Sequence, residues 1–435
     1  MDMKNKKILS IAVFLLLIAV SIFVFKSRDT FADTHTTYYS GEAVFYKNKI
    51  IIGTINSGRA EIFTVKEGKI EKVSQILPQS EEKEFNDLIF NQTEEDLYLY
   101  LTNGRYFYQY NISSPKEPLL AKKLKDNSWD WFKGLEKKGE YVITLGSQGT
   151  KIWNQDLQNI SSYLFPENEY QYNINFFPDE GYVLNLDKKG IEVYNPVSGQ
   201  KTAQKDLRFE GDHFRKAHYD SEEGIYVVDD NSLKKYGINN SAEKLDKKRE
   251  FKHISEHGYD VDGLKGSGYI YFSDGVGVVK ADKYSLNPVD WIFTTGVGEA
   301  GSWAQGIRVV QTNKEEAIVV FNLNNILVLN KDMEVIDHYD PQEEPSQIKR
   351  KFYLKLNTKE AVAGEQVTLT GGGFANKEKI IIEYLQEKVE VWADEKGKFS
   401  QELIIPSQVS PSYISIRAEG EKSGLYRGIS LKIRD

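Results

Sequence analysis

The sequence predicts an all-β protein: a seven-bladed β-propeller, then an immunoglobulin-like (Ig-like) β-sandwich, with one N-terminal hydrophobic helix. Three observations predict it: an apolar strand that recurs seven times, a different strand pattern after residue 350, and an unbroken apolar run at Ile8–Phe25. Segments such as Leu97–Leu101 are typical of strands, because aromatic and β-branched side chains pack well on a pleated surface. Outside the N-terminal run, no segment has the periodicity of an amphipathic helix.

The apolar run at the N-terminus is flanked by basic residues on both sides. It is longer than the usual core of a signal peptide and close to the roughly 20 residues of a membrane-spanning helix. Ala32 is a small residue that would permit cleavage before Asp33. We therefore expect residues 1–32 to be a signal anchor or a signal peptide. In both cases residues 33–435 are exported, as the extracellular part of a single-pass cell-membrane protein or, alternatively, as a secreted protein.

Bulk composition limits the classes of function. A chain of 435 residues is long enough for two or three domains. The formal net charge is −8 and no basic face is evident, so no nucleic-acid partner is expected. The absence of cysteine excludes disulfides, thiolate metal sites and a cysteine nucleophile.

A strand of about six apolar residues recurs through the first 340 residues. Its spacing of roughly 41 to 48 residues is the range of four-stranded propeller blades. Weaker strands and turns rich in Gly, Asn and Asp surround each copy, and tight hairpin turns need such residues because they require positive φ. We predict seven blades over residues 33–340; the alternative, unrelated hairpins in sandwiches, lacks so regular a period. The copies begin near Ile50, Tyr98, Tyr141, Tyr182, Ile225, Tyr269 and Ala317.

A second domain follows the repeat. The stretch Asp340–Gln347 is polar and contains proline, and residues 341–350 are predicted to be a linker. Residues 351–435 then contain about seven short strands, which favours an Ig-like sandwich.

Parts of the chain resemble known families. Arg105–Leu120 (RYFYQYNISSPKEPLL) resembles the bacterial LVIVD-type repeat, with Asn111 where that family usually has Asp, and Gly181–Gln200 is similar to WD40-like and quinoprotein-type blades. Ala363–Phe374 and Ala393–Phe399 resemble the bacterial Ig-like modules that are appended to extracellular proteins. These resemblances imply the two folds and a spacer or adhesion role for the second domain, and they transfer no activity.

Three short motifs match catalytic or metal-binding patterns without the required context. His253–His257 fits H-x-x-E-H, but a zinc site of this kind needs a helix and none is predicted there. Gly296–Gly301 matches G-x-G-x-x-G but leads into a strand instead of a helix. Tyr259–Gly263 resembles the start of a calcium loop and lacks the later ligands, so an Asp-Gly turn is expected, with a partial calcium site as the alternative. No catalytic residue, metal site or cofactor is predicted.

The loops that join one blade to the next contain unusual aromatic, histidine and charged residues. Loops on a rigid scaffold tend to carry function, and aromatic anchors favour binding of sugars or protein surfaces. We therefore predict a ligand-binding site on this face, although about half of these side chains could instead pack between blades. The predicted binding residues are Trp129, Trp131, Tyr170, His213, Arg215, His253, His257, Tyr259 and Trp303.

These observations favour a non-enzymatic cell-surface binding or scaffold protein, with a protein or a cell-wall glycan as its partner. The alternative is an extracellular enzyme, carbohydrate-active or quinoprotein-like, with its site in the propeller channel. Such an enzyme would need convergent carboxylates or a metal, and the repeats show no shared acidic position. A third possibility is self-assembly of the Ig-like module through exposed strand edges.

Overall fold

The computed structural model describes the chain from residue 38 to residue 434, with gaps. The described residues are 38, 41–78, 84–125, 132–138, 141–146, 149–164, 171–177, 181–186, 190–194, 201–206, 214–220, 223–229, 231–238, 245–252, 258–275, 277–294, 304–341, 353–385, 387–407, 412–423 and 426–434. Within them the chain is all-β, and none of them belongs to a helix long and apolar enough to cross a membrane. The hydrophobic helix expected at Ile8–Phe25 lies outside these residues.

The first 28 strands form seven groups of four consecutive strands. Each group is an antiparallel meander, called sheet 1 to sheet 7 in chain order. Sheet 1 consists of β1 (Gly41–Tyr46), β2 (Lys49–Asn56), β3 (Arg59–Lys66) and β4 (Lys69–Ile76); sheet 2 of β5 (Asp87–Gln92), β6 (Leu97–Asn103), β7 (Tyr106–Asn111) and β8 (Leu119–Lys125). Sheet 3 consists of β9 (Phe132–Lys138), β10 (Tyr141–Gly146), β11 (Gly149–Trp153) and β12 (Asn159–Leu164); sheet 4 of β13 (Gln171–Phe177), β14 (Gly181–Leu186), β15 (Gly190–Tyr194) and β16 (Lys201–Asp206). Sheet 5 consists of β17 (Phe214–Asp220), β18 (Gly224–Asp229), β19 (Ser232–Ile238) and β20 (Leu245–Lys252); sheet 6 of β21 (Asp260–Gly263), β22 (Tyr269–Ser273), β23 (Gly277–Asp282) and β24 (Pro288–Phe293); sheet 7 of β25 (Ala304–Gln311), β26 (Glu316–Asn322), β27 (Ile326–Asn330) and β28 (Val335–Tyr339).

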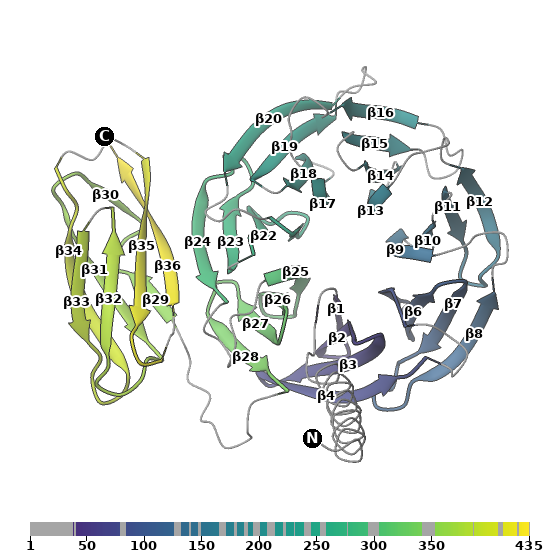
Figure 1. Ribbon diagram of the computed structural model, residues 1–435, viewed down its shortest axis with the longest axis horizontal. Helices are drawn as coiled ribbons and strands as arrows, with labels where there is room; N and C mark the ends of the chain where they lie inside the picture. Colours follow the sequence, from purple (N-terminus) through teal and green to yellow (C-terminus); the bar gives the residue numbers. More distant parts are fainter. Residues whose placement is uncertain are drawn as a thin grey trace, which may run out of the picture.

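The seven sheets follow one another around a ring (Figure 1). The first strand of each sheet is innermost, and it packs against the first strands of the two neighbouring sheets. The recurring apolar strand of the sequence is the second strand of every sheet: β2, β6, β10, β14, β18, β22 and β26. Neighbouring strands flank it on both sides and other sheets cover both its faces, so it is almost continuously buried, as β26 illustrates. This explains why its sequence is apolar throughout instead of alternating.

The ring closes where sheet 7 meets sheet 1, and no strand is shared between them. Apolar side chains of both sheets form one cluster, in which Phe63 and Phe321 are fully buried. The Phe321 ring occupies the place of a side chain at Gly41, since a Cβ there would lie 2.0 Å from it. The Ile70 backbone N–H also donates to Asp337 Oδ2 at 2.8 Å. The boundary between sheets 7 and 1, called the seam here, is therefore held by side-chain packing and single hydrogen bonds.

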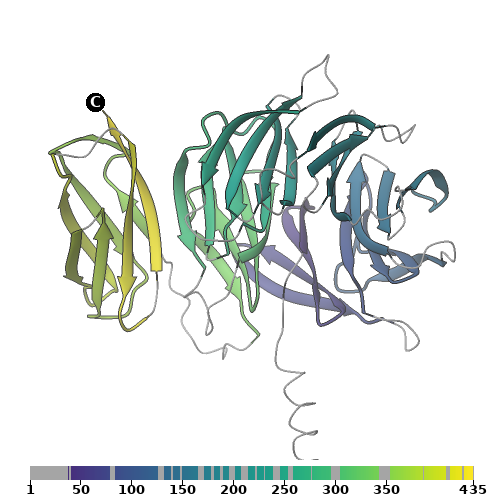
Figure 2. The ribbon, with the colours of Figure 1, turned by 45° about the horizontal axis from the view of Figure 1, so that its top comes forward.

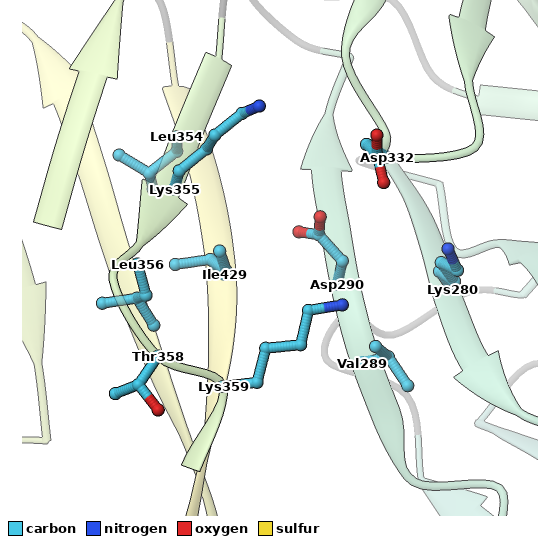
Figure 3. A pocket seen from close by; sticks show the side chains of 10 residues that line it. All are labelled: Lys280, Val289, Asp290, Asp332, Leu354, Lys355, Leu356, Thr358, Lys359 and Ile429. Atoms are coloured by element: carbon cyan, nitrogen blue, oxygen red, sulfur yellow. The ribbon is translucent and has the colours of Figure 1, made fainter. Parts of the chain in front are cut away.

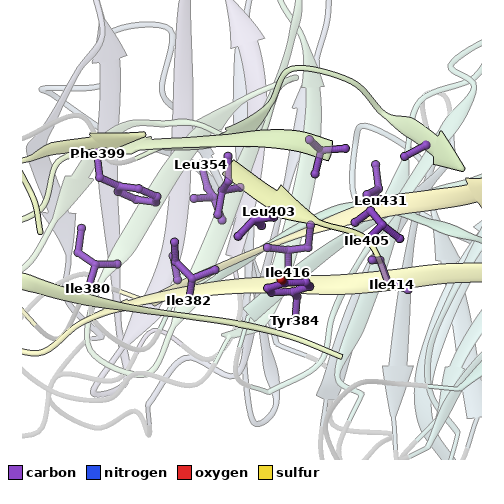
Figure 4. Packing of buried hydrophobic residues seen from close by; sticks show 14 of the residues in the cluster. Leu354, Ile380, Ile382, Tyr384, Phe399, Leu403, Ile405, Ile414, Ile416 and Leu431 are labelled. Carbon is purple, nitrogen blue, oxygen red and sulfur yellow. The ribbon is translucent and has the colours of Figure 1, made fainter. Parts of the chain in front are cut away.

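The C-terminal region forms a separate unit of two sheets around its own core. One sheet has the order β29-β31-β34, and the other has the order β36-β35-β32-β33, with β30 parallel to β36. Between them lies a cluster of buried residues that includes Ile380, Ile382 and Leu431 (Figure 4). The strands are β29 (Tyr353–Leu356), β30 (Glu360–Val362), β31 (Gln366–Gly372), β32 (Lys379–Tyr384), β33 (Glu387–Trp392), β34 (Lys398–Ile404), β35 (Ser412–Gly420) and β36 (Tyr426–Arg434).

The C-terminal unit lies against sheet 6 of the ring (Figures 1 and 2). Its strand β36 pairs antiparallel with β24 at Asp290 and Ile429, so that sheet 6 continues into the unit as one nine-stranded sheet. Apart from Pro341, the linker predicted at 341–350 lies outside the described residues. The two parts are thus joined by strand pairing as well as by the chain.

Candidate functional site

The strand order fixes which strand ends share a face of the ring. In a four-stranded meander the fourth strand ends at the level where the first strand begins. The ends of the fourth strands and the starts of the innermost strands therefore lie on one face, called the rim here. The second strands also end, and the third strands begin, on this face.

Of the nine predicted binding residues, two lie in the described part of the chain. Arg215 near the start of β17 and Tyr259 just before β21 come together across the boundary between sheets 5 and 6, with the guanidinium carbon 5.8 Å from the ring centroid. Arg215 is exposed and Tyr259 is half-buried, and the Tyr259 backbone N–H donates to Ser273 O at 3.0 Å. This is a cation–π contact at the rim. The other seven, Trp129, Trp131, Tyr170, His213, His253, His257 and Trp303, lie outside the described residues.

The motif expectations have different outcomes. The Asp-Gly turn expected at Tyr259–Gly263 is wrong: Asp260–Gly263 is strand β21, the innermost strand of sheet 6. Its carboxylates are held by protein partners, Asp260 by Arg308 and Asp262 by His218, and the described residues contain no group of three potential metal ligands. The motifs at His253–His257 and Gly296–Gly301 lie outside the described residues.

A cavity of about 330 Å³, called the channel cavity here, lies among the innermost strands of the ring. Side chains from β1, β9, β17, β21 and β25 form its wall, and most of the large ones are charged or polar. The sequence did not predict this site because its acidic residues do not recur at one position of the repeat. Glu42 lies opposite Gly53 of the second strand, whereas Asp262 lies opposite Tyr271. The signal that was present is an ionisable residue in the first strand of several sheets. The lining residues are Glu42, Ala43, Glu136, Lys216, Ala217, His218, Tyr219, Val261, Asp262, Arg308 and Val309.

Arg308 of β25 links three sheets at this cavity. Its Nε donates to Glu42 Oε1 at 2.6 Å, and its Nη1 donates to Asp260 Oδ2 at 2.7 Å. Burial alone would lower the pKa of Arg308, but Glu42, Asp260 and Asp262 raise it well above its usual value. Burial raises the pKa of Glu42 to about 7, although Arg308 counteracts part of this rise. Arg308 is therefore always charged here and ties sheets 1, 6 and 7 together.

Several buried or half-buried carboxylates accept hydrogen bonds from the backbone of the next innermost strand. Asp87 accepts from Leu135 N at 2.8 Å, joining β5 to β9. In the same way Asp260 accepts from Ile307 N at 3.1 Å and Asp262 accepts from Val309 N at 2.8 Å. An innermost strand has no ladder partner on its channel side, so its N–H groups need such acceptors. These three carboxylates are therefore part of the scaffold.

Three further groups face the cavity. His218 Nδ1 lies 3.0 Å from Asp262 Oδ1. Burial alone would raise the pKa of Asp262, but the hydrogen bond and charge of His218 lower it overall. Burial raises the pKa of Glu136, whose Oε1 accepts from the neighbouring Lys137 N at 3.2 Å and from no other described residue. Lys216 forms no hydrogen bond or ion pair with any described residue, and its charge acts at longer range on Glu42, Asp87 and Glu136.

A second cavity, of about 210 Å³, lies at the junction of the ring and the C-terminal unit (Figure 3). Its charged groups link the two parts: Arg427 Nη2 lies 3.5 Å from Asp290 Oδ2, and Lys355 Nζ lies 2.7 Å from Glu334 Oε1. Burial raises the pKa of Asp290 to about 6, with Arg427 opposing it. We interpret this cavity as part of the joint.

Comparisons with known proteins assign no family to this chain. No model of a known protein family matches it, and a search of curated proteins found no match. The function is therefore argued from the geometry of the rim and of the channel cavity.

Proposed function

We propose that this protein is an exported, non-enzymatic binding or scaffold protein of the cell surface. On this proposal the ring is a seven-bladed β-propeller, the C-terminal unit is an Ig-like module, and residues 1–32 attach the chain to the membrane or direct its secretion. The propeller is supported by seven consecutive four-stranded meanders around a ring, and the Ig-like module by two sheets packed around one core.

The partner, a protein or a cell-wall glycan, binds at the rim on this proposal. The observation that carries it is the contact between Arg215 and Tyr259. An exposed guanidinium held over an aromatic ring is oriented before binding, and a guanidinium is suited to recognise hydroxyl, carboxylate or backbone oxygens of a partner. Tyr and Arg are also among the residues that contribute most to binding at interfaces.

A capture experiment tests the proposal. The full-length chain in mild detergent is immobilised and exposed to cell-wall polysaccharide and surface proteins of its own source. We expect specific capture that Arg215→Ala/Tyr259→Ala weakens by about tenfold or more. The matched control is Arg249→Ala/Tyr284→Ala: Arg249 lies on the outermost strand β20, and Tyr284 lies in a turn on the face opposite the rim. Capture that responds equally to both double variants would place the partner elsewhere.

One observation favours the alternative, an extracellular enzyme with its site in the channel. Carboxylates of several sheets converge there, and His218 stands in contact with Asp262, as a general base and its orienting group would. Chromogenic glycosides incubated with the full-length chain test this alternative. It requires turnover that His218→Gln abolishes and that both Arg215→Ala/Tyr259→Ala and Arg249→Ala/Tyr284→Ala leave unchanged.

A further inference from the structure

Two opposite charges at the channel cavity have no side-chain partner among the residues that the structure describes. Lys216 of β17 and Glu136 of β9 both line it, and they do not form an ion pair with each other. The other charged groups of its wall are engaged, Arg308 with Glu42 and Asp260, and His218 with Asp262. The only hydrogen bond to Glu136 comes from the adjacent backbone, and Lys216 has none among the described residues.

Charged side chains at a cavity wall are destabilised by desolvation unless a group of opposite charge pairs with them. A half-buried carboxylate without a cation at ion-pair distance is destabilised by desolvation. Burial is the main cause of the raised pKa of Glu136, and the charge of Lys216 offsets only part of the rise. An ammonium ion bound near Glu136 would lessen this penalty. A carboxylate bound near Lys216 would pair with the one side-chain cation that the described wall leaves without a close partner.

We propose that the channel cavity binds a small zwitterion of the amino-acid type, with its ammonium group at Glu136 and its carboxylate at Lys216. The volume of about 330 Å³ is at the small end of ligand pockets, and the wall is polar. A ligand that carries both charges uses both residues without adding net charge to a site already rich in ions. This inference goes beyond the rim-binding function, because it concerns a different place and a different class of ligand.

Isothermal titration calorimetry of the full-length chain in mild detergent tests the inference. The probes are glycine, β-alanine and γ-aminobutyrate, which separate the two charges by increasing distances. Propylamine and propionate are the matched controls, since each is close in size to β-alanine and carries one charge. We expect at least one amino acid to bind about tenfold or more tightly than both controls.

Variants assign the contacts. Lys216→Met is expected to lose the preference for the amino acid over propylamine, and Glu136→Gln the preference over propionate. Lys314 is exposed and lies in the turn between β25 and β26, so Lys314→Met is expected to keep both preferences. If a cavity variant does not fold, the inference is tested by the selectivity of the wild-type chain for the amino acids over propylamine and propionate.

Two results would overturn the inference: no saturable heat with any amino acid, or no amino acid that binds more tightly than both propylamine and propionate. In the first case Lys216 only balances the channel carboxylates at a distance. Neither result bears on capture at the rim, which is read with macromolecular partners and with variants of Arg215 and Tyr259. The two proposals therefore fail independently.

Discussion

Trp291 of the ring occupies the space that a side chain at Gly428 of the C-terminal unit would need. A Cβ built on Gly428 would lie 1.8 Å from Trp291 Nε1. Trp291 is buried in the cluster of sheets 5 and 6, so it has little room to move. Beside it, Arg427 is fully buried within 3.5 Å of Asp290. The two parts are thus in close contact at this point of the junction.

The first prediction concerns this contact. Gly428→Ala should destabilise the junction by about 1 to 3 kcal/mol, because overpacking forces Trp291 or β36 to shift. Hydrogen exchange of β24 and β36 measures the effect, with faster exchange expected in both strands. Gly268→Ala is the control, since a Cβ at Gly268 meets nothing within 4 Å. Equal exchange in the two variants would contradict the prediction.

The second prediction concerns Arg308. Arg308→Leu leaves Glu42 and Asp260 buried without their cation, and we expect a loss of about 3 to 5 kcal/mol in the free energy of unfolding. Arg308→Lys should recover only part of it, because an ammonium cannot reproduce the planar two-sided contact. Urea unfolding measures both, with Arg249→Leu as the exposed control. A loss of unfolding free energy no larger than that of Arg249→Leu would show that the ion pairs of Arg308 do not stabilise the ring.

The third prediction is the pH dependence due to Glu42. Its pKa is about 7 in the folded chain, above its ordinary value of 4.5. The folded state therefore binds this proton more tightly, so the stability linked to it is fully present below about pH 4.5 and is lost as pH rises through about 7. Glu42→Gln should flatten the fall in stability between about pH 5 and pH 8, by up to about 3 kcal/mol.

Urea unfolding of the wild type and Glu42→Gln across this range is the measurement, and the difference between the two curves isolates Glu42 from other titrating groups. Asp290→Asn is a useful comparison. Because the pKa of Asp290 is about 6, that variant should flatten an earlier part of the curve. Parallel curves for the wild type and Glu42→Gln would refute the assignment.

The fourth prediction tests whether the C-terminal core is separate from the ring. Ile382 is fully buried between the two sheets of the C-terminal unit. Ile382→Ala should cost this unit about 2 to 5 kcal/mol and leave the ring almost unaffected. Differential scanning calorimetry should then show an earlier transition for the unit, while the transition of the ring stays in place. A single shifted transition would indicate that both parts unfold together.

The sequence allowed prediction of the second strand of each sheet and not of the channel. Strands such as β26 are buried on both faces, which leaves an unmistakable apolar run. The innermost strands alternate between packing and lining the channel, so Glu42 and Asp262 stand in short segments with no common pattern. Their meeting with Arg308 depends on closure of the ring, which brings together residues 266 positions apart.

The junction was equally hidden from sequence reasoning. The pairing of β36 with β24 rests on one residue pair, Asp290 with Ile429. Nothing local in β24 marks it as the edge that another unit will extend. The site residues at the rim were chosen for their chemistry, and the contact between Arg215 and Tyr259 depends on the adjacency of β17 and β21, which only the ring supplies.

The seam between sheets 7 and 1 has a mechanical consequence. The chain itself crosses the other six boundaries of the ring, whereas this one is held by a shared apolar cluster, the ion pair of Arg308 with Glu42 and hydrogen bonds such as that from Ile70 to Asp337. Tension between the chain entering at sheet 1 and the unit held by sheet 6 would pull this boundary apart before any sheet unravels. The ring would then open between sheets 7 and 1 while each sheet stays folded, and it could close again without refolding its sheets.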